Sequence, residues 1–204
     1  MFSLALRGFA LGFAVAASPG PIFFLCVRRT LVRGRLHGLL SGFGVATVDG
    51  FYAAVAVFGF AALSAAIAAQ RKPLALVGAL VLVALGVRIL LEGVSIETAP
   101  TTNGRGLAMA YVSMVGLTIT NPATIVSFAA LAAALGLGTA GSWARPAVVV
   151  LGVLLGSAAW WCLLVVAAGT LRSRLTPRVV RGISVASGSA IALLGLVAAY
   201  AALG

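Results

Sequence analysis

Apolar residues fall into six long stretches that short polar segments separate. The stretches cover residues 3–27, 38–68, 74–91, 107–135, 146–169 and 182–203. A transmembrane helix requires about 20 predominantly apolar residues, and each stretch reaches or approaches that length. The pattern predicts an all-α integral membrane protein with about six transmembrane helices.

The segments between the stretches carry signals that end or begin helices. They are the basic loop 28–37, the turn 70–73, the polar segment 92–106, a glycine-rich turn that ends at Arg145, and the basic loop 171–181. Pro73, Pro146 and Pro177 lie at or just before expected helix starts, where the missing N–H of proline leaves no hydrogen bond unmade. We interpret residues 1–27 as the first span and not as a signal peptide, because no positive charge precedes the apolar run and Arg7 lies inside it.

Basic residues are distributed unevenly over these segments. The first, third and fifth segments contain Arg28, Arg29, Arg33, Arg35, Arg105, Arg172, Arg174, Arg178 and Arg181. The second and fourth contain only Arg71, Lys72 and Arg145, while Arg88 can reach the first side from the inner end of the third span. Since cytoplasmic loops are enriched in basic residues, we expect the odd segments in the cytoplasm and both termini outside.

The two halves of the chain share several features. Ser18-Pro19-Gly20-Pro21 in the first stretch matches Thr120-Asn121-Pro122 in the fourth, and Gly38 and Gly42 in the second match Gly152 and Gly156 in the fifth. Two halves of three spans must be inverted relative to each other, as in many secondary transporters. We therefore predict two inverted three-helix repeats, residues 1–102 and 103–204, although the chain's 25 glycines also allow a chance match.

Composition excludes a water-soluble protein. Hydrophobic residues make up 62% of the chain, charged residues 8%, and the mean hydropathy is +1.19, whereas soluble domains carry about 25% charged residues. The net charge of +11 is confined to short clusters between apolar stretches. That distribution favours cytoplasmic loops beside an anionic lipid surface over a nucleic-acid partner.

Asp49 is the candidate for substrate or ion coupling. Glu92 and Glu97 fall in a polar segment, so Asp49 is the acidic residue expected within a span. A carboxylate at mid-membrane is costly unless it is paired, hydrated or protonated. Its spacing from Gly38 and Gly42 places it on the small-residue face, which should point into the bundle. The alternative is a structural aspartate that receives hydrogen bonds from nearby hydroxyl groups.

The two proline breaks are candidates for binding a substrate carboxylate. We expect Ser18 to be an N-cap with Pro19 and Pro21 in the first helical turn, and Asn121-Pro122 to repeat this arrangement. Each half-helix would then direct free N–H groups and a positive dipole end into the bundle. Simple proline kinks are the alternative.

Together these features predict a binding site for a zwitterion: two positive helix ends for a carboxylate, and Asp49 for an ammonium group or a coupling proton. The sequence contains no catalytic constellation, metal-ligand spacing or cofactor motif, so we expect no enzyme activity, metal or cofactor. We interpret His37 as a solvated loop residue and Cys26 and Cys162 as small buried hydrophobes. Trp160 and Trp161 either line a cavity or fill the core.

At this point the chain resembles the lysine exporter (LysE/RhtB) family of bacterial amino-acid efflux proteins. The resemblance rests on Pro19-Gly20-Pro21, Gly34-Arg35-Leu36-His37-Gly38, Gly44 with Asp49 and Gly59, Gly78 with Leu85-Gly86-Val87-Arg88, Asn121-Pro122, and Gly152, Gly156 and Trp160. It implies six spans in two inverted halves, an inner-membrane location, and amino-acid efflux driven by an ion gradient. Val48, Val81-Leu82 and Ala123 depart from the family's usual residues, which leaves the identity of the amino acid open. A homo-oligomer is also left open.

Two other classes remain as alternatives. A metal-ion or oxyanion exporter would need several oxygen or sulfur ligands, and one intramembrane aspartate supplies few. A transmembrane thiol carrier of the CcdA type would depend on Cys26 and Cys162, and neither has a proline within three residues. Replacement of both cysteines would abolish a thiol carrier and spare an exporter.

Overall fold

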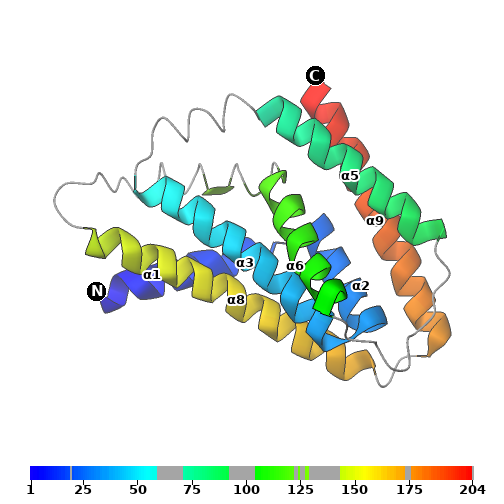
Figure 1. Ribbon diagram of the computed structural model, residues 1–204, viewed down its shortest axis with the longest axis horizontal. Coiled ribbons are helices and arrows are strands. Elements are labelled where there is room, and N and C mark those ends of the chain that lie inside the picture. The colour runs from blue at the N-terminus through cyan, green and yellow to red at the C-terminus, as the bar shows by residue number, and fades with distance from the viewer. Residues whose placement is uncertain are drawn as a thin grey trace.

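The computed structural model describes residues 1–18, 20–58, 71–91, 104–121, 124, 127–128, 143–172 and 176–203. Within these ranges the chain is helical and has no strand. The helices are α1 (Phe2–Ala16), α2 (Pro21–Arg33), α3 (Arg35–Val57), α5 (Arg71–Leu91), α6 (Gly104–Ile119), α8 (Ala144–Arg172) and α9 (Pro177–Leu203) (Figure 1). Helical conformation also occurs at Thr124 and at 127–128.

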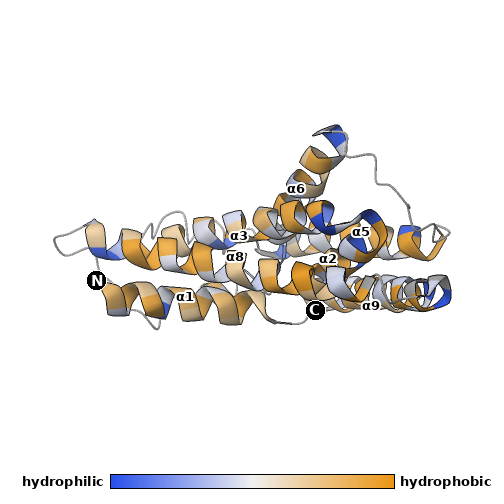
Figure 2. Cartoon of the chain, turned by 90° about the horizontal axis from the view of Figure 1, so that it is seen from below, coloured by the Kyte–Doolittle hydropathy of each residue, from blue (hydrophilic) through white to orange (hydrophobic). Residues whose placement is uncertain are grey.

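The helices have the length and hydropathy of membrane spans. Among the described residues, α3, 144–171 of α8 and 181–203 of α9 are each long and apolar enough to cross a bilayer. α1 and α2 pass the same test as a pair bent by 80°, while α6 and 75–91 of α5 are shorter apolar helices. Most residues of these helices are hydrophobic (Figure 2). The protein is thus an all-α multi-pass membrane protein, and the number of six spans stays a prediction.

α1 and α8 pack closely against each other at glycine residues. A Cβ atom added at Gly8 would come within 2.5 Å of the Val149 carbonyl oxygen, and one at Gly152 within 2.5 Å of the Ala5 carbonyl oxygen. Gly12 and Gly156 are packed as closely against the partner helix. Residue numbers rise together along this contact, so the two helices are parallel and lie side by side (Figure 1). Small residues at a spacing of four allow this backbone approach.

The other helix pairs have a related arrangement. α3 runs antiparallel to α8, with Gly42 against Trp161 and Gly50 against Leu154. α3 runs parallel to α6, because Gly44 packs on Tyr111 while Tyr52 further along donates a hydrogen bond to the Ile119 carbonyl at 2.8 Å.

α5 and α9 form a further antiparallel pair on one side of the molecule, where α9 also packs against α2 (Figure 1). Gly86 lies against Gly188 and Ala192, and Gly195 against Ala79.

The prediction of a basic loop at residues 28–37 is wrong. α2 extends to Arg33 and α3 begins at Arg35, so Gly34 alone separates them, with a φ of 93° that suits glycine. Arg29 is compatible with this packed position because neutral groups accept hydrogen bonds from its guanidinium group. It donates to Ser41 Oγ and the Ala110 carbonyl at 3.0 Å each and to Ser113 Oγ at 2.9 Å.

Other sequence expectations near helix ends also need correction. His37 is a buried residue of α3, 6% exposed, and not a solvated loop residue. The stretch 3–27 is two helices because α1 already ends at Ala16. α5 begins at Arg71, inside the predicted turn 70–73, and α9 begins at Pro177, inside the predicted loop 171–181. Glu92 and Glu97 lie outside the described residues.

Candidate functional site

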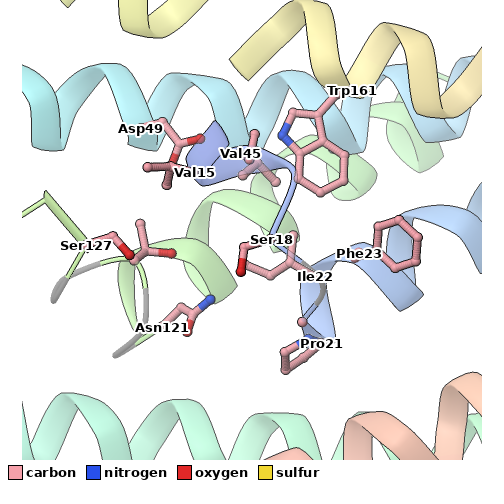
Figure 3. Close-up of a pocket in the computed structure, with 13 residues that line it drawn as sticks. Val15, Ser18, Pro21, Ile22, Phe23, Val45, Asp49, Asn121, Ser127 and Trp161 are labelled. Carbon is pink, nitrogen blue, oxygen red and sulfur yellow. The ribbon is translucent and has the colours of Figure 1, made fainter. Parts of the chain in front are cut away.

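A cavity of about 100 Å³ lies where α1 ends, α2 begins and the middle of α3 approaches α8. Its walls are formed by Val15, Ala16, Ser18, Gly20, Pro21, Ile22, Phe23, Val45, Asp49, Asn121, Thr124, Ser127 and Trp161. Figure 3 shows Asp49, Ser18, Asn121 and Trp161 around this common space. Residues from both predicted breaks and from the second predicted span therefore meet at one place.

The first break exposes the start of α2 to the cavity. Gly20 is the N-cap, with an extended backbone, and Pro21 is the first helical residue. The N–H groups of Ile22 and Phe23, which line the cavity, have no acceptor within the helix. Ser18 lies before the N-cap and also lines the cavity, so the prediction that it caps the helix is wrong. Pro19 lies outside the described residues.

The second break lies at the end of α6. The helix ends at Ile119, Asn121 is not helical, and helical conformation returns at Thr124. Asn121, Thr124 and Ser127 line the cavity. Thr120 is not among the lining residues, and its hydroxyl donates to the carbonyls of Gly116 at 3.0 Å and Leu117 at 3.3 Å. Pro122 lies outside the described residues.

Asp49 is buried in the middle of α3, with 2% of its surface exposed, as the glycine spacing predicted. The hydroxyl of Ser157 on α8 donates a hydrogen bond to its Oδ2 atom at 2.6 Å. Asp49 therefore has the hydroxyl donor that we expected if its role were structural. Asp49 nevertheless also lines the cavity.

Trp161 lines the same cavity and carries a buried hydrogen-bond donor. The side chain is 2% exposed, and its Nε1 atom has no acceptor among the described residues. In Figure 3 the indole nitrogen lies on the edge of the ring that faces Val45 and Asp49. Trp160 differs, because its ring packs edge-on against Phe13 at 5.2 Å and does not line the cavity.

Sequence reasoning did not select Ser157, Thr124 or Ser127 and left Trp161 undecided. A usable signal was the presence of hydroxyl residues inside otherwise apolar stretches, since such groups need a partner in a membrane interior. Ser157 follows Gly156 directly, so it lies near a close helix contact. Within the described residues, no group of three or more His, Cys, Asp or Glu side chains could hold a metal ion.

The two cysteines do not form a pair. Cys26 is fully buried in α2, with its thiol 3.6 Å from the Gly38 carbonyl oxygen, and Cys162 on α8 is half-buried. Both are free thiols. Cys26 thus behaves as the small buried hydrophobe that we expected.

The helices and the partly polar cavity between them define a multi-pass membrane protein with an internal cavity. The family model for the LysE type translocator matches residues 13–202, so the chain belongs to that family and is a membrane transporter. Searches of curated proteins and of solved structures gave no match.

Proposed function

We propose that this protein exports an amino acid or a close derivative across the bacterial inner membrane, driven by an ion gradient, without converting it chemically. The observation that carries the proposal is the meeting of Asp49 with the start of α2 in one cavity. A carboxylate and a positive helix end on the walls of a small space complement the two charges of a zwitterion.

The start of α2 suits the carboxylate of the solute. The N–H groups of Ile22 and Phe23 lie at the positive end of the helix dipole. Trp161 adds an indole N–H on the same cavity wall. The N–H group of an indole is a donor only, so it can serve an anionic or carbonyl group of the solute.

Asp49 suits the ammonium group or a coupling proton. It is the acidic residue of the cavity, and the hydrogen bond from Ser157 fixes the orientation of its carboxylate. Ser18, Asn121, Thr124 and Ser127 complete the polar part of the wall. The volume of about 100 Å³ favours a small solute in this conformation.

Helix packing supports the inverted repeats, residues 1–102 and 103–204. If α1 corresponds to α6, α3 to α8 and α5 to α9, the parallel contact of α1 with α8 is equivalent to that of α6 with α3. Exchanging the two halves turns the antiparallel contact of α3 with α8 into the same contact, and likewise for α5 with α9. These directions also match spans that alternate across the membrane and leave both termini on one side. We propose that this side is the outside, because basic residues are enriched in the odd segments of the chain.

The test is counterflow of radiolabelled amino acids in proteoliposomes that contain the purified protein. We expect uptake of at least one small amino acid against an unlabelled internal pool, and stimulation of net transport by an ion gradient. Failure of every amino acid in a complete panel would contradict the proposed substrate class. A reporter fused at Gly204 tests the orientation, and a cytoplasmic signal would contradict it.

A further inference from the structure

A second cavity, of about 330 Å³, lies where α1 and α8 begin. It is lined by Met1, Ser3, Leu4, Arg7, Arg145 and Val149. Because the two helices are parallel and packed through Gly8 and Val149, their first turns lie at the same level. The cavity is separate from the central one, with which it shares no lining residue.

Among the described residues, the positive charge in this cavity has no acidic partner. Arg7 and Arg145 are both exposed, and neither makes a hydrogen bond or an ion pair with a described residue. Asp49 is the one acidic residue in the part of the chain that the structure describes, and it is bonded to Ser157. Two guanidinium groups around one space repel each other, and the starts of two helices add further positive potential. The cavity therefore favours an anion.

The position of the cavity relative to the bilayer identifies the kind of anion. Arg7 is the only charged residue of α1 and lies about 7.5 Å along the helix from Phe2, within reach of the headgroups for a long side chain. Trp143, directly before α8, is 77% exposed and contacts Phe58 with the ring centroids 5.3 Å apart. Exposed tryptophan is typical of the membrane–water interface.

The remaining wall is apolar. Leu4 and Val149 lie beside the two arginines, and such side chains suit the glycerol and acyl region of a lipid better than a hydrated free ion. Guanidinium groups bind phosphate oxygens in a two-point geometry.

We propose that the cavity between the starts of α1 and α8 binds the phosphate of an anionic phospholipid, with Arg7 and Arg145 as its two ligands. One lipid then contacts both helices at the end opposite the α1–α2 break. This inference concerns lipid binding by the folded protein and is independent of the transported solute.

The test uses the purified full-length protein in a neutral detergent. Thermal unfolding is measured with added phosphatidylglycerol, phosphatidylcholine or inorganic phosphate, and native mass spectrometry counts bound lipids. We expect phosphatidylglycerol to raise Tm by about 5 °C at concentrations well above its Kd, and the other two additives to have little effect. In the Arg7→Gln, Arg145→Gln double variant, we expect most of this shift and the bound lipid to be lost.

Two arginines elsewhere provide matched controls. Arg105 is the second residue of α6, as Arg145 is of α8, and Arg181 is the fifth residue of α9; both are exposed. The Arg105→Gln, Arg181→Gln variant should keep the full shift. The proposal is overturned if both double variants lose the shift equally, if the Arg7/Arg145 variant keeps it, or if inorganic phosphate reproduces it. If the glutamine variant does not fold, the lysine variant at both positions replaces it, and unchanged lipid affinity in that variant would also overturn the two-point contact.

Discussion

The hydroxyl of Ser157 donates a hydrogen bond of 2.6 Å to Oδ2 of Asp49, and this bond links two residues 108 positions apart. It connects α3 with α8, the antiparallel helices whose contact also includes Gly42 and Trp161. The carboxylate is thus positioned at a helix–helix contact and lines the central cavity at the same time. A change in how α3 packs on α8 would therefore change what the cavity presents to a solute.

Replacing Asp49 with asparagine separates its charge from its shape. We expect Asp49→Asn to reach the membrane at normal abundance, because an amide can still accept the Ser157 hydrogen bond. Net export against a gradient should fall about tenfold or more, since the titratable group is gone. The measurement is gradient-driven efflux normalised to protein level. Normal export at normal abundance would leave Asp49 with a structural role only.

Removing the Ser157 hydroxyl should lower stability. Ser157→Ala leaves a buried carboxylate oxygen without its donor, which costs about 1–3 kcal/mol, so we expect a lower Tm in detergent. Ser157→Thr keeps the hydroxyl and serves as the control. The Asp49→Ala, Ser157→Ala double variant completes a mutant cycle in which each single change removes the bond, and strictly additive effects would show that the bond contributes nothing.

The Trp161 indole N–H has a specific test. Trp161→Phe keeps an aromatic ring and removes the donor, so we expect the apparent KM for the solute to rise about tenfold with little change in maximal rate. Trp160 is the matched control, because its Nε1 also lacks a partner in the described part of the chain but lies outside the cavity lining. Equal effects of Trp160→Phe and Trp161→Phe would assign both residues to packing.

Arg29 should hold α2 against the bundle. Its three hydrogen bonds connect α2 to α3 and α6, and hydrogen bonds of charged groups contribute about 1.5–3 kcal/mol each. In a Cys162→Ser background, Arg29→Ala should speed maleimide labelling of the buried Cys26 about tenfold or more. Arg33→Ala, an exposed position on the same helix, should not. Equal labelling rates in the two variants would show that α2 does not depend on Arg29.

Glycines on different faces should respond in opposite directions. Gly12→Ala places a methyl group against the backbone of Val153, so it should separate α1 from α8 and lower Tm. Gly116→Ala on α6 has nothing within 4 Å of the new carbon and should gain about 1 kcal/mol of helix propensity. Thermal unfolding in detergent measures both, and similar Tm values would contradict the close contact.

The extent of sequence-based prediction can be judged from particular residues. Apolar stretches predicted α3, α8 and α9, which are long and apolar enough to cross a bilayer, because a bilayer demands length and hydropathy from each span. The burial of Asp49 was predictable because Gly38 and Gly42, four residues apart, lie on one helix face with Asp49, seven residues after Gly42. Proline and asparagine marked both breaks, because these residues interrupt the regular backbone.

The remaining features depend on contacts between distant segments. Arg28, Arg29 and Arg33 indicated a loop, yet they belong to a helix because partners on α3 and α6 satisfy Arg29. The burial of His37 follows from the same short α2–α3 connection. No local pattern could place Ser157 or Trp161 beside Asp49, since the separation of 108 residues carries no periodic signal.

The glycine contact of α1 with α8 also constrains the order in which the helices assemble during biosynthesis. Gly12 meets Val153, about 140 residues later in the chain, and ribosomes add about 5–20 residues per second. The first helix of the nascent protein therefore waits roughly 7–28 seconds in the membrane before its partner is made. During that interval its small-residue face lacks the helix that covers it in the folded protein, and the walls of the central cavity, which include Trp161, can be completed only after α8 has been inserted.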